Sequence, residues 1–359
     1  MPTPWGRRFV DVGSGNRRPR EDDYPMRRLL RYLLLLVIVL AALIWLNNTS
    51  LLSSAPGGRP SLLAHRGLAQ TFTREGLDGE TCTATRIHPP EHGFIENTLP
   101  SMQAAFSAGA DIVELDVHLT TDGHFAVFHD WTLDCRTDGK GVTREHSLSE
   151  LKALDVGYGY TADGGATFPL RGKGAGLLPS LDEVLAAFPD KRFLIHVKSN
   201  DPLEGDKLAG LLSRLAPATR AGLMVYGGTP PVEALHARLP GVKVGSKKSL
   251  KDCLVRYLLL GWSGHVPQAC RAGLMLVPIN IAPWLWGWPD RFQQRMREAG
   301  VAVFVLGPYD GGAFSSGIDD LDQLSQLPKS FAGGIWTNRI DRIGPAARAG
   351  GDDSGTPTH

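Results

Sequence analysis

The chain has 359 residues, of which 42% are hydrophobic, and its formal net charge is +1. This length is enough for one large α/β domain or two small ones, and the apolar content is ample for a sizeable core. A near-neutral charge argues against a polyanion-binding protein, so nucleic acid is not expected as a partner.

The N-terminal segment is basic and leads into an apolar stretch. Arginines crowd residues 1–28, and residues 32–46 carry no charge. The uncharged run is shorter than the roughly 20 residues of an average membrane helix, but Leu29, Leu30 and the stem of Arg31 lengthen it. The sequence therefore predicts a cytoplasmic segment (residues 1–28), a single transmembrane signal-anchor (residues 29–47) and a linker (residues 48–60).

A basic flank before an apolar run is also typical of a signal peptide. Ser53, Ser54 and Ala55 are small enough for cleavage, but Pro56 follows at once and would hinder processing. We therefore favour an uncleaved anchor over a cleaved signal, and over a buried core helix. This prediction makes the chain a single-pass membrane protein whose part after Asn47 lies on the periplasmic or extracellular side.

From residue 61 onward, strand and helix patterns alternate. Strands are predicted at residues 61–64, 111–120, 125–129, 192–198, 222–226, 242–245, 273–278, 301–306 and 333–337. Helices are predicted at residues 99–107, 181–187, 206–215, 230–238, 290–299 and 318–326. Several strands are continuous apolar runs, as in parallel sheets that are covered on both faces.

This alternation predicts a closed (β/α)₈ barrel over residues 61–345. A doubly wound open sheet is the alternative, although no Gly-rich phosphate fingerprint follows the first strand. The remaining segment, residues 346–359, is small, polar and Gly-rich, and we predict that it is a disordered tail.

Residues suited to catalysis fall at the ends of predicted strands. Glu114 and Asp116 are two residues apart in one strand, and a strand's period of two turns both side chains to the same face. Adjacent carboxylates repel each other unless a cation lies between them, and oxygen ligands suit magnesium, calcium or manganese. His65, Arg66 and His129 lie where two other strands end, as catalytic residues do in parallel barrels. The combination indicates metal-assisted phosphate chemistry.

Short motifs follow one another in a fixed order after residue 60. They are His65-Arg66-Gly67, Glu96-Asn97-Thr98, Glu114-Leu115-Asp116-Val117, Thr121-Asp122-Gly123, His129-Asp130, Pro179-Ser180-Leu181, Lys198 and Gly334-Ile335-Trp336-Thr337. The series resembles the glycerophosphodiester phosphodiesterase family over nearly the whole chain after the linker. One tripeptide alone would be a weak signal, but so many in order are specific.

The resemblance implies a TIM barrel that hydrolyses glycerophosphodiesters to an alcohol and glycerol 3-phosphate with a divalent cation. It implies that His65 and His129 are the acid–base pair, without saying which is the base. It also implies that Arg66 and Lys198 bind phosphate. The implied carboxylate cluster around the metal consists of Glu96, Glu114 and Asp116.

Three features depart from the family pattern. His196 stands where the family usually has a metal-binding glutamate, two residues before Lys198. If His196 ligates, an imidazole removes negative charge and softens the site, so manganese or zinc become alternatives to magnesium or calcium. If it does not ligate, the site is weakened. The other departures are Asn338, where the family often has aspartate, and a long insertion at residues 68–95.

These departures leave alternatives to the favoured function. One is a phospholipase D-like or phosphoinositide-cleaving barrel that acts on intact lipid, to which the anchor would bring it. The other is a catalytically inert barrel that binds phosphoesters, which His196 and Asn338 would explain.

Four cysteines in a domain outside the cytoplasm predict two disulfides. Cys253 and Cys270 lie in one local insertion, and we favour a bridge between them. A bridge between Cys82 and Cys135 would tie the long insertion to the loop after His129. Four unpaired thiols are the alternative.

Overall fold

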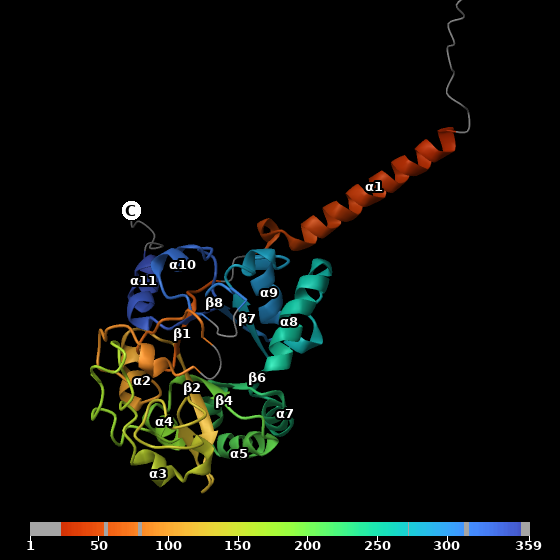
Figure 1. Ribbon diagram of the computed structural model, residues 1–359. Helices are drawn as coiled ribbons and strands as arrows, with labels where there is room; N and C mark the ends of the chain where they lie inside the picture. Colours follow the sequence, from red (N-terminus) through yellow and green to blue (C-terminus); the bar gives the residue numbers. More distant parts are fainter. Residues whose placement is uncertain (1–22, 54–56, 78–80, 272, 312–315, 353–359) are drawn as a thin grey trace, which may run out of the picture. The chain divides into compact units, whose positions relative to one another are not determined.

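A computed structural model describes residues 23–53, 57–77, 81–271, 273–311 and 316–352 (Figure 1). The chain divides into two compact units, Met1–Leu46 and Asn47–His359. Most of the basic segment predicted at residues 1–28 lies outside the described residues, as does the predicted tail from residue 353 onward.

Helix α1 (Asp23–Asn48) contains the predicted membrane anchor. Its residues Pro25–Asn48 form a 24-residue stretch that is long and apolar enough to cross a membrane. A signal sequence near the N-terminus meets the same criteria. The helix begins before the predicted span of residues 29–47, so the arginines at its start are helical as well.

Eight parallel strands of the second unit form a nearly closed barrel. They are β1 (Ser61–His65), β2 (Ile112–Leu119), β4 (Arg192–Val197), β5 (Leu223–Gly227), β6 (Lys243–Ser246), β7 (Leu274–Pro278), β8 (Ala302–Leu306) and β9 (Gly334–Thr337). Their order around the sheet is β6-β5-β4-β2-β1-β9-β8-β7, and a parallel bridge from Val244 to Gly273 brings β6 beside β7. The predicted (β/α)₈ TIM barrel is confirmed.

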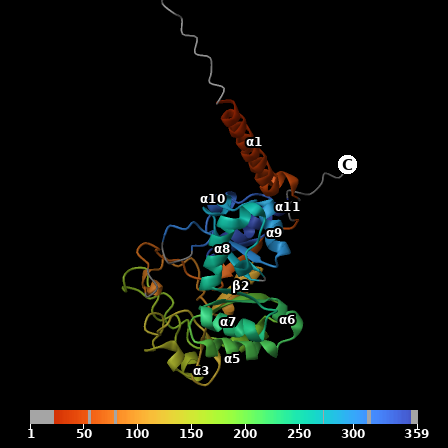
Figure 2. The same ribbon diagram turned by 90° about the vertical axis from the view of Figure 1, so that its right-hand side faces the viewer.

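Helices cover the outside of the strands in both views of the molecule (Figures 1 and 2). They are α2 (Leu99–Ser107), α3 (Leu148–Lys152), α4 (Leu181–Ala187), α5 (Pro202–Ser213), α6 (Pro217–Ala221), α7 (Thr229–Arg238), α8 (Lys247–Leu260), α9 (Asp290–Glu298), α10 (Leu321–Ser325) and α11 (Ile340–Asp352). The main core lies between these helices and the strands, where Val113, Leu115 and Val117 of β2 are completely buried.

Helix α11 corrects the prediction for the end of the chain. Residues 346–352 were expected to be disordered, but α11 continues to Asp352. Ile340 and Ile343 are fully buried, and Ala347 packs against the same core. These apolar contacts hold the helix in place although its sequence is rich in glycine and contains Pro345.

The barrel interior has an apolar floor and a polar mouth. The floor includes Leu63, Ile112, Leu194, Met224 and Trp336, which belong to one buried cluster. Two residues further along the same strands, or just past their ends, lie His65, Glu114, His196, Tyr226 and Asn338. Because alternate side chains of a strand point to the same face, the period of two places this polar layer at the carboxyl ends of the strands.

Strand β3 (Phe125–Val127) lies outside the barrel order and pairs antiparallel with the end of β2. The hairpin runs back along β2, so that the Phe128 amide donates to the Asp116 carbonyl at 3.0 Å. This return brings His129 to the level of Asp116 in the barrel mouth.

Both predicted disulfides are present, Cys82–Cys135 and Cys253–Cys270. The first joins the insertion at residues 68–95 to the loop after His129. The second joins α8 to the short turn Gln268–Cys270.

Candidate active site

The end of β1 turns sharply at His65-Arg66-Gly67. Arg66 has a left-handed backbone with φ of 58°, and Gly67 has φ of 81°. A Cβ at Gly67 would lie 2.6 Å from the Ser101 hydroxyl oxygen, so only glycine fits there. The turn directs the Arg66 side chain to the barrel mouth, where its Nε is 3.3 Å from Asp116 Oδ2.

A chain of hydrogen bonds fixes the ring of His65. Asn338 Nδ2 donates to Asp319 Oδ2 at 2.8 Å, which turns the amide oxygen of Asn338 toward His65 Nδ1 at 2.7 Å. Because that oxygen only accepts, Nδ1 carries the proton and Nε2 is left with a lone pair. Burial, followed by the charge of Arg66, lowers the pKa of His65 well below its ordinary value, so the ring is neutral.

Glu114 and Asp116 form the buried acid pair of the site. Both side chains point inward from β2, and both residues are completely buried. Glu114 Oε1 accepts a 2.7 Å hydrogen bond from the Tyr226 hydroxyl, and Oε2 is 3.7 Å from His65 Nε2. Asn97 Nδ2 and His196 Nδ1 donate hydrogen bonds to Asp116. Arg66 Nε and Lys198 Nζ form ion pairs with it at 3.3 and 3.4 Å.

The two acids differ in their pKa values. Burial and the charge of Asp116 raise the pKa of Glu114 to about 8. Asp116 is equally buried, but Lys198, His129 and Arg66 hold its pKa well below the ordinary range. Glu114 is therefore the member of the pair that is protonated at neutral pH when no cation is bound.

His196 lies beside Asp116 because the two residues are register partners on β4 and β2. Its Nδ1 is 2.9 Å from Asp116 Oδ1 and 4.0 Å from Glu114 Oε1. The imidazole stacks on Tyr226 with 4.2 Å between ring centroids. Burial, followed by the charge of Lys198, lowers the pKa of His196 to about 4, so the ring is neutral, as a metal ligand must be.

The ligand atoms of Glu114, Asp116 and His196 lie within 4.8 Å of one another. Two carboxylates and one neutral imidazole are a suitable donor set for a divalent cation, which would also relieve the repulsion between the buried acids. The residues present therefore fit a divalent metal. Lys198, one residue past β4, brings its Nζ to 3.4 Å from Asp116 Oδ1 at the edge of this group.

Glu96, which was predicted to lie in the metal cluster, is not in this group of described residues. Its Oε1 is 2.9 Å from Arg66 Nη1, and its Oε2 is 2.9 Å from Arg136 Nη1. Burial opposes ionisation, but the two arginines outweigh it and lower the pKa of Glu96. Both oxygens of Glu96 are thus occupied by guanidinium groups.

The residues after Glu96 have separate structural tasks. Asn97 has φ of 60°, and its amide both donates to Asp116 Oδ2 at 3.0 Å and accepts from the Asp116 backbone N–H at 3.2 Å. Thr98 caps α2 in a reciprocal capping box with Ser101. The motif therefore couples the acid pair to the start of α2.

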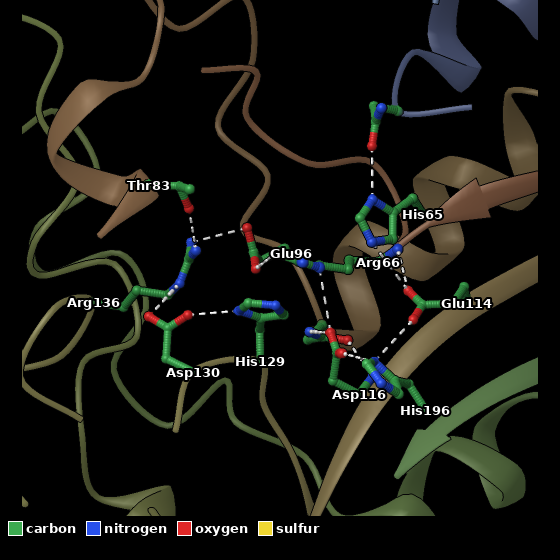
Figure 3. Close-up of polar contacts among 12 residues, drawn as sticks. His65, Arg66, Thr83, Glu96, Glu114, Asp116, His129, Asp130, Arg136 and His196 are labelled. Atoms are coloured by element: carbon green, nitrogen blue, oxygen red, sulfur yellow. Dashed lines mark hydrogen bonds and ion pairs between the residues drawn. The ribbon is translucent and has the colours of Figure 1, made fainter. Parts of the chain in front are cut away.

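His129 faces the cluster from the loop after β3. Figure 3 shows His65 and His129 around the group formed by Arg66, Glu114 and Asp116. Asp130 Oδ1 accepts from His129 Nδ1 at 2.6 Å, so Nε2 takes no part in this bond. Burial, followed by Arg66, lowers the pKa of His129.

The structure thus brings seven of the eight predicted residues together. His65, Arg66, Glu114, Asp116, His129, His196 and Lys198 share the barrel mouth, and Glu96 joins them through Arg66.

Tyr226, Arg136 and Asp319 also belong to the site but are not among the predicted residues. Tyr226 ends a predicted strand, which is a signal for a mouth position. Arg136 follows a cysteine of a predicted disulfide. Asp319 carries no such signal, because only the folded chain places it beside Asn338.

Residues 65–214 match the model of the glycerophosphoryl diester phosphodiesterase family. This segment belongs to that family. A glycerophosphodiester phosphodiesterase of Caldanaerobacter subterraneus is 40% identical over 104 residues, which cover 29% of this chain and 39% of the relative. The chain thus aligns with well under half the length of this family member.

Solved structures of family members share the fold. A glycerophosphodiester phosphodiesterase from Agrobacterium tumefaciens has a TM-score of 0.52 at 23% identity, covering 81% of this chain and 99% of the other. A phosphodiesterase from Oleispira antarctica, solved in complex with the product sn-glycerol-3-phosphate, has a TM-score of 0.50 at 19% identity, covering 82% and 97%. At these identities the likeness concerns the barrel itself.

Proposed function

We propose that this protein hydrolyses glycerophosphodiesters to an alcohol and glycerol 3-phosphate. The observation that carries the proposal is the pair His65 and His129. Each has its Nδ1 held by a partner in the protein, and His65 Nε2 lies 3.7 Å from Glu114 Oε2 of the buried acid pair. Family membership and the product bound to the Oleispira phosphodiesterase support the same reaction.

In the proposed reaction, one histidine accepts a proton from the nucleophile, which is water or the substrate's own adjacent hydroxyl. The nucleophile forms a bond to phosphorus, and the bond from phosphorus to the alcohol oxygen breaks. If the nucleophile is the substrate's own hydroxyl, the first product is a cyclic phosphate, which water then opens to glycerol 3-phosphate. The other histidine donates a proton to that leaving oxygen. Histidine suits both tasks because it titrates nearest to neutral pH.

We assign His65 as the base and His129 as the acid. His129 Nδ1 bonds the carboxylate of Asp130, which stabilises an imidazolium, whereas His65 Nδ1 bonds a neutral amide. The pKa of His65 is also the more strongly lowered of the two. His129 therefore holds a proton more readily, and His65 accepts one from a nucleophile through Nε2.

Arg66 and Lys198 would bind the phosphate. Both cations form ion pairs with Asp116: Arg66 Nε is 3.3 Å from Oδ2, and Lys198 Nζ is 3.4 Å from Oδ1. A planar guanidinium can grip two phosphate oxygens, while the ammonium acts as a point charge. Their charges would offset the negative charge that grows on the phosphate oxygens during cleavage.

Glu114, Asp116 and His196 would hold a divalent cation, with Glu96 supporting Arg66 rather than the metal. The bound cation would supply positive charge to the phosphate and lower the pKa of a water molecule. Magnesium or calcium suits the two carboxylates, and manganese or zinc becomes suitable because of His196.

A metal-screened assay tests this function. The purified, metal-stripped protein would be given magnesium, calcium, manganese or zinc with glycerophosphocholine, and glycerol 3-phosphate would be measured enzymatically. Metal-dependent release is expected. Failure with every ion, while phosphate still binds, would instead support the inert phosphoester-binding barrel.

An activity on intact lipid is the second candidate, and exposed apolar side chains near the start of the second unit favour it. Asn47 and Asn48 donate to the Trp262 carbonyl, and Leu259 and Trp262 are exposed there. Phosphatidylcholine vesicles in the same assay distinguish the two. Release of choline or phosphocholine from vesicles, without cleavage of glycerophosphocholine, would favour this candidate.

We also propose that α1 anchors the protein, with its arginines cytoplasmic and residues after Asn47 outside. The length and apolarity of Pro25–Asn48 support the anchor, and two disulfides suit an oxidising compartment. Sequencing of the mature N-terminus tests it, because a start at residue 56 or later would mean that the anchor is removed.

A further inference from the structure

Arg136 lies at the centre of the loop side of the site. It is only 2% exposed, yet it makes four side-chain contacts. They are Nε to Asp130 Oδ2 at 2.8 Å, Nη1 to Glu96 Oε2 at 2.9 Å, Nη1 to the Tyr160 hydroxyl at 2.7 Å, and Nη2 to Thr83 Oγ1 at 2.5 Å. Figure 3 shows this guanidinium between Glu96, Asp130 and Thr83.

Each carboxylate that Arg136 binds also holds one proposed functional residue. Asp130 uses its other oxygen for His129 Nδ1, and Glu96 uses its other oxygen for Arg66 Nη1. One guanidinium thus joins a proposed proton donor and a proposed phosphate-binding residue. Removing it would leave the buried Glu96 and the partly buried Asp130 each without one partner, which is costly where water is largely excluded.

Charge alternates along this chain of contacts. The order is Arg66, Glu96, Arg136 and Asp130, so each carboxylate contacts a guanidinium group, and Asp130 also binds His129 Nδ1. Burial works against the charge of Arg136, but Asp130 and Glu96 raise its pKa well above the ordinary value. Arg136 is therefore a permanent cation within the network.

The disulfide Cys82–Cys135 fixes Arg136 in this position. Cys135 immediately precedes Arg136, and Cys82 immediately precedes Thr83, which contacts the same guanidinium. The bridge thereby holds the arginine and one of its partners together, although they are far apart in the sequence.

We propose that Arg136 is a positioning residue that sets His129 and Arg66 relative to each other, through Asp130 and Glu96. This inference rests on the proposed function, because it assigns His129 to proton transfer and Arg66 to phosphate binding. Arginine is required because its planar fork reaches two carboxylates at once, which an ammonium cannot do in the same geometry.

Three single variants test separately the contact of Arg136 through Asp130 to His129 and its contact through Glu96 to Arg66. Asp130→Asn is expected to lower kcat and to leave the affinity for inorganic phosphate nearly unchanged. Glu96→Gln is expected to weaken phosphate binding and raise KM, with a smaller loss in kcat. Arg136→Lys is expected to do both, with kcat about 10- to 100-fold lower, as is usual when a supporting residue is lost.

A double-variant comparison tests whether Arg136 acts through Asp130. If it does, Arg136→Lys combined with Asp130→Asn will lower kcat little more than the stronger single variant does. Independent, multiplying losses would overturn the proposal. Unchanged kcat and unchanged phosphate affinity in Arg136→Lys would overturn it as well.

Arg171→Lys is the matched control. Arg171 stacks on Phe168 and Tyr158 in a nearby loop, at 3.6 and 3.9 Å, and its Nε donates to the Tyr158 carbonyl. It should leave kcat and phosphate affinity unchanged. Thermal unfolding of each variant identifies misfolded protein, and Thr83→Val, which removes one contact of Arg136 and keeps its charge, serves if Arg136→Lys does not fold.

Two measurements need no turnover, so the inference can fail separately from the proposed function. Calorimetric titration with inorganic phosphate measures the phosphate affinity, to which Arg66 contributes. The NMR signal of the ¹⁵N-bound proton on His129 Nδ1 reports the strength of its hydrogen bond to Asp130. In Arg136→Lys, phosphate affinity should fall and this proton signal should move toward that of a weaker hydrogen bond. If both stay as in the parent while the parent is active, Arg136 has no positioning role.

Discussion

The two halves of the candidate site are held by different physical means. Glu114, His196 and Tyr226 lie on neighbouring barrel strands, and their mutual positions follow from strand register. His129 and Arg136 lie in loops outside the barrel, where an ion-pair chain and a disulfide hold them. The strand half is thus positioned by the backbone, whereas the loop half depends on side chains that can be removed one at a time.

The largest expected effect comes from the histidine that each half contributes. His65→Ala and His129→Ala should each lower kcat by about 10²- to 10⁴-fold, because each removes one proton transfer. The leaving group tells them apart. With a nitrophenyl phosphodiester, whose leaving group needs no proton, His129→Ala should recover much of its activity, whereas His65→Ala should not.

Initial rates with glycerophosphocholine and the nitrophenyl ester provide the measurement. His236→Ala is a control, since His236 lies on α7 outside the site. Recovery by His65→Ala instead would reverse the two roles. Near-full activity of both variants toward glycerophosphocholine would contradict the acid–base assignment altogether.

The two disulfides offer a matched comparison. Cys82–Cys135 closes a loop with a sequence separation of 53 and supports the loop half, whereas Cys253–Cys270 has a separation of 17 and lies buried in the main core beside α8. From loop-closure entropy, replacing both cysteines of a bridge by serine should lower the free energy of unfolding by about 4 kcal/mol for the first and about 3 kcal/mol for the second.

Only the first replacement should impair catalysis in protein that remains folded, because only that bridge fixes Arg136. Chemical denaturation measures the stability, and kcat is measured at a temperature where both variants are folded. Equal losses of kcat in the two variants would show that the bridges act on overall stability alone.

Sequence patterns were most informative for the strand half. The spacing of Glu114 and Asp116 predicts that both face inward, and the residues at strand ends predict the mouth of the barrel. His65 and His196 follow from the same reasoning. In each case the local periodicity is enough to predict where the side chain lies, because a residue's position along a barrel strand determines how far it is from the mouth of the barrel.

The loop half was less accessible to such reasoning. Glu96 carries a carboxylate in a family motif, but sequence spacing does not reveal that two arginines occupy its oxygens. Arg136 could be placed only through the disulfide beside it. Helix α8, which spans Lys247–Leu260, was not among the predicted helices.

His196 allows the strand half to be changed without altering the loop half. His196→Glu should restore a third carboxylate and shift metal preference from manganese or zinc toward magnesium or calcium, by about 10- to 100-fold in relative affinity. Competition between manganese and magnesium, followed by the paramagnetic signal of bound manganese, measures the shift. Unchanged preference would mean that His196 does not ligate.

The smallest expected effect is a proton released when metal binds the strand half. With its pKa raised to about 8, Glu114 holds a proton at pH 7 in the metal-free protein, and a cation requires the carboxylate. Binding at pH 7 should therefore release about one proton, and affinity should rise about tenfold per pH unit until it levels off near pH 8. Calorimetry in buffers of different ionisation enthalpy counts the proton.

Tyr226→Phe sharpens this test. The Tyr226 hydroxyl donates to Glu114 Oε1, and this hydrogen bond lowers the pKa of Glu114 from what burial and Asp116 alone would give. Its removal should raise that pKa further, so that metal affinity levels off at a higher pH than in the parent. Tyr309→Phe, at an exposed position, should leave the profile unchanged. A metal affinity independent of pH between 6 and 8 in the parent would mean that Glu114 is already ionised. The positive charge near the acid pair would then exceed what Arg66 and Lys198 provide.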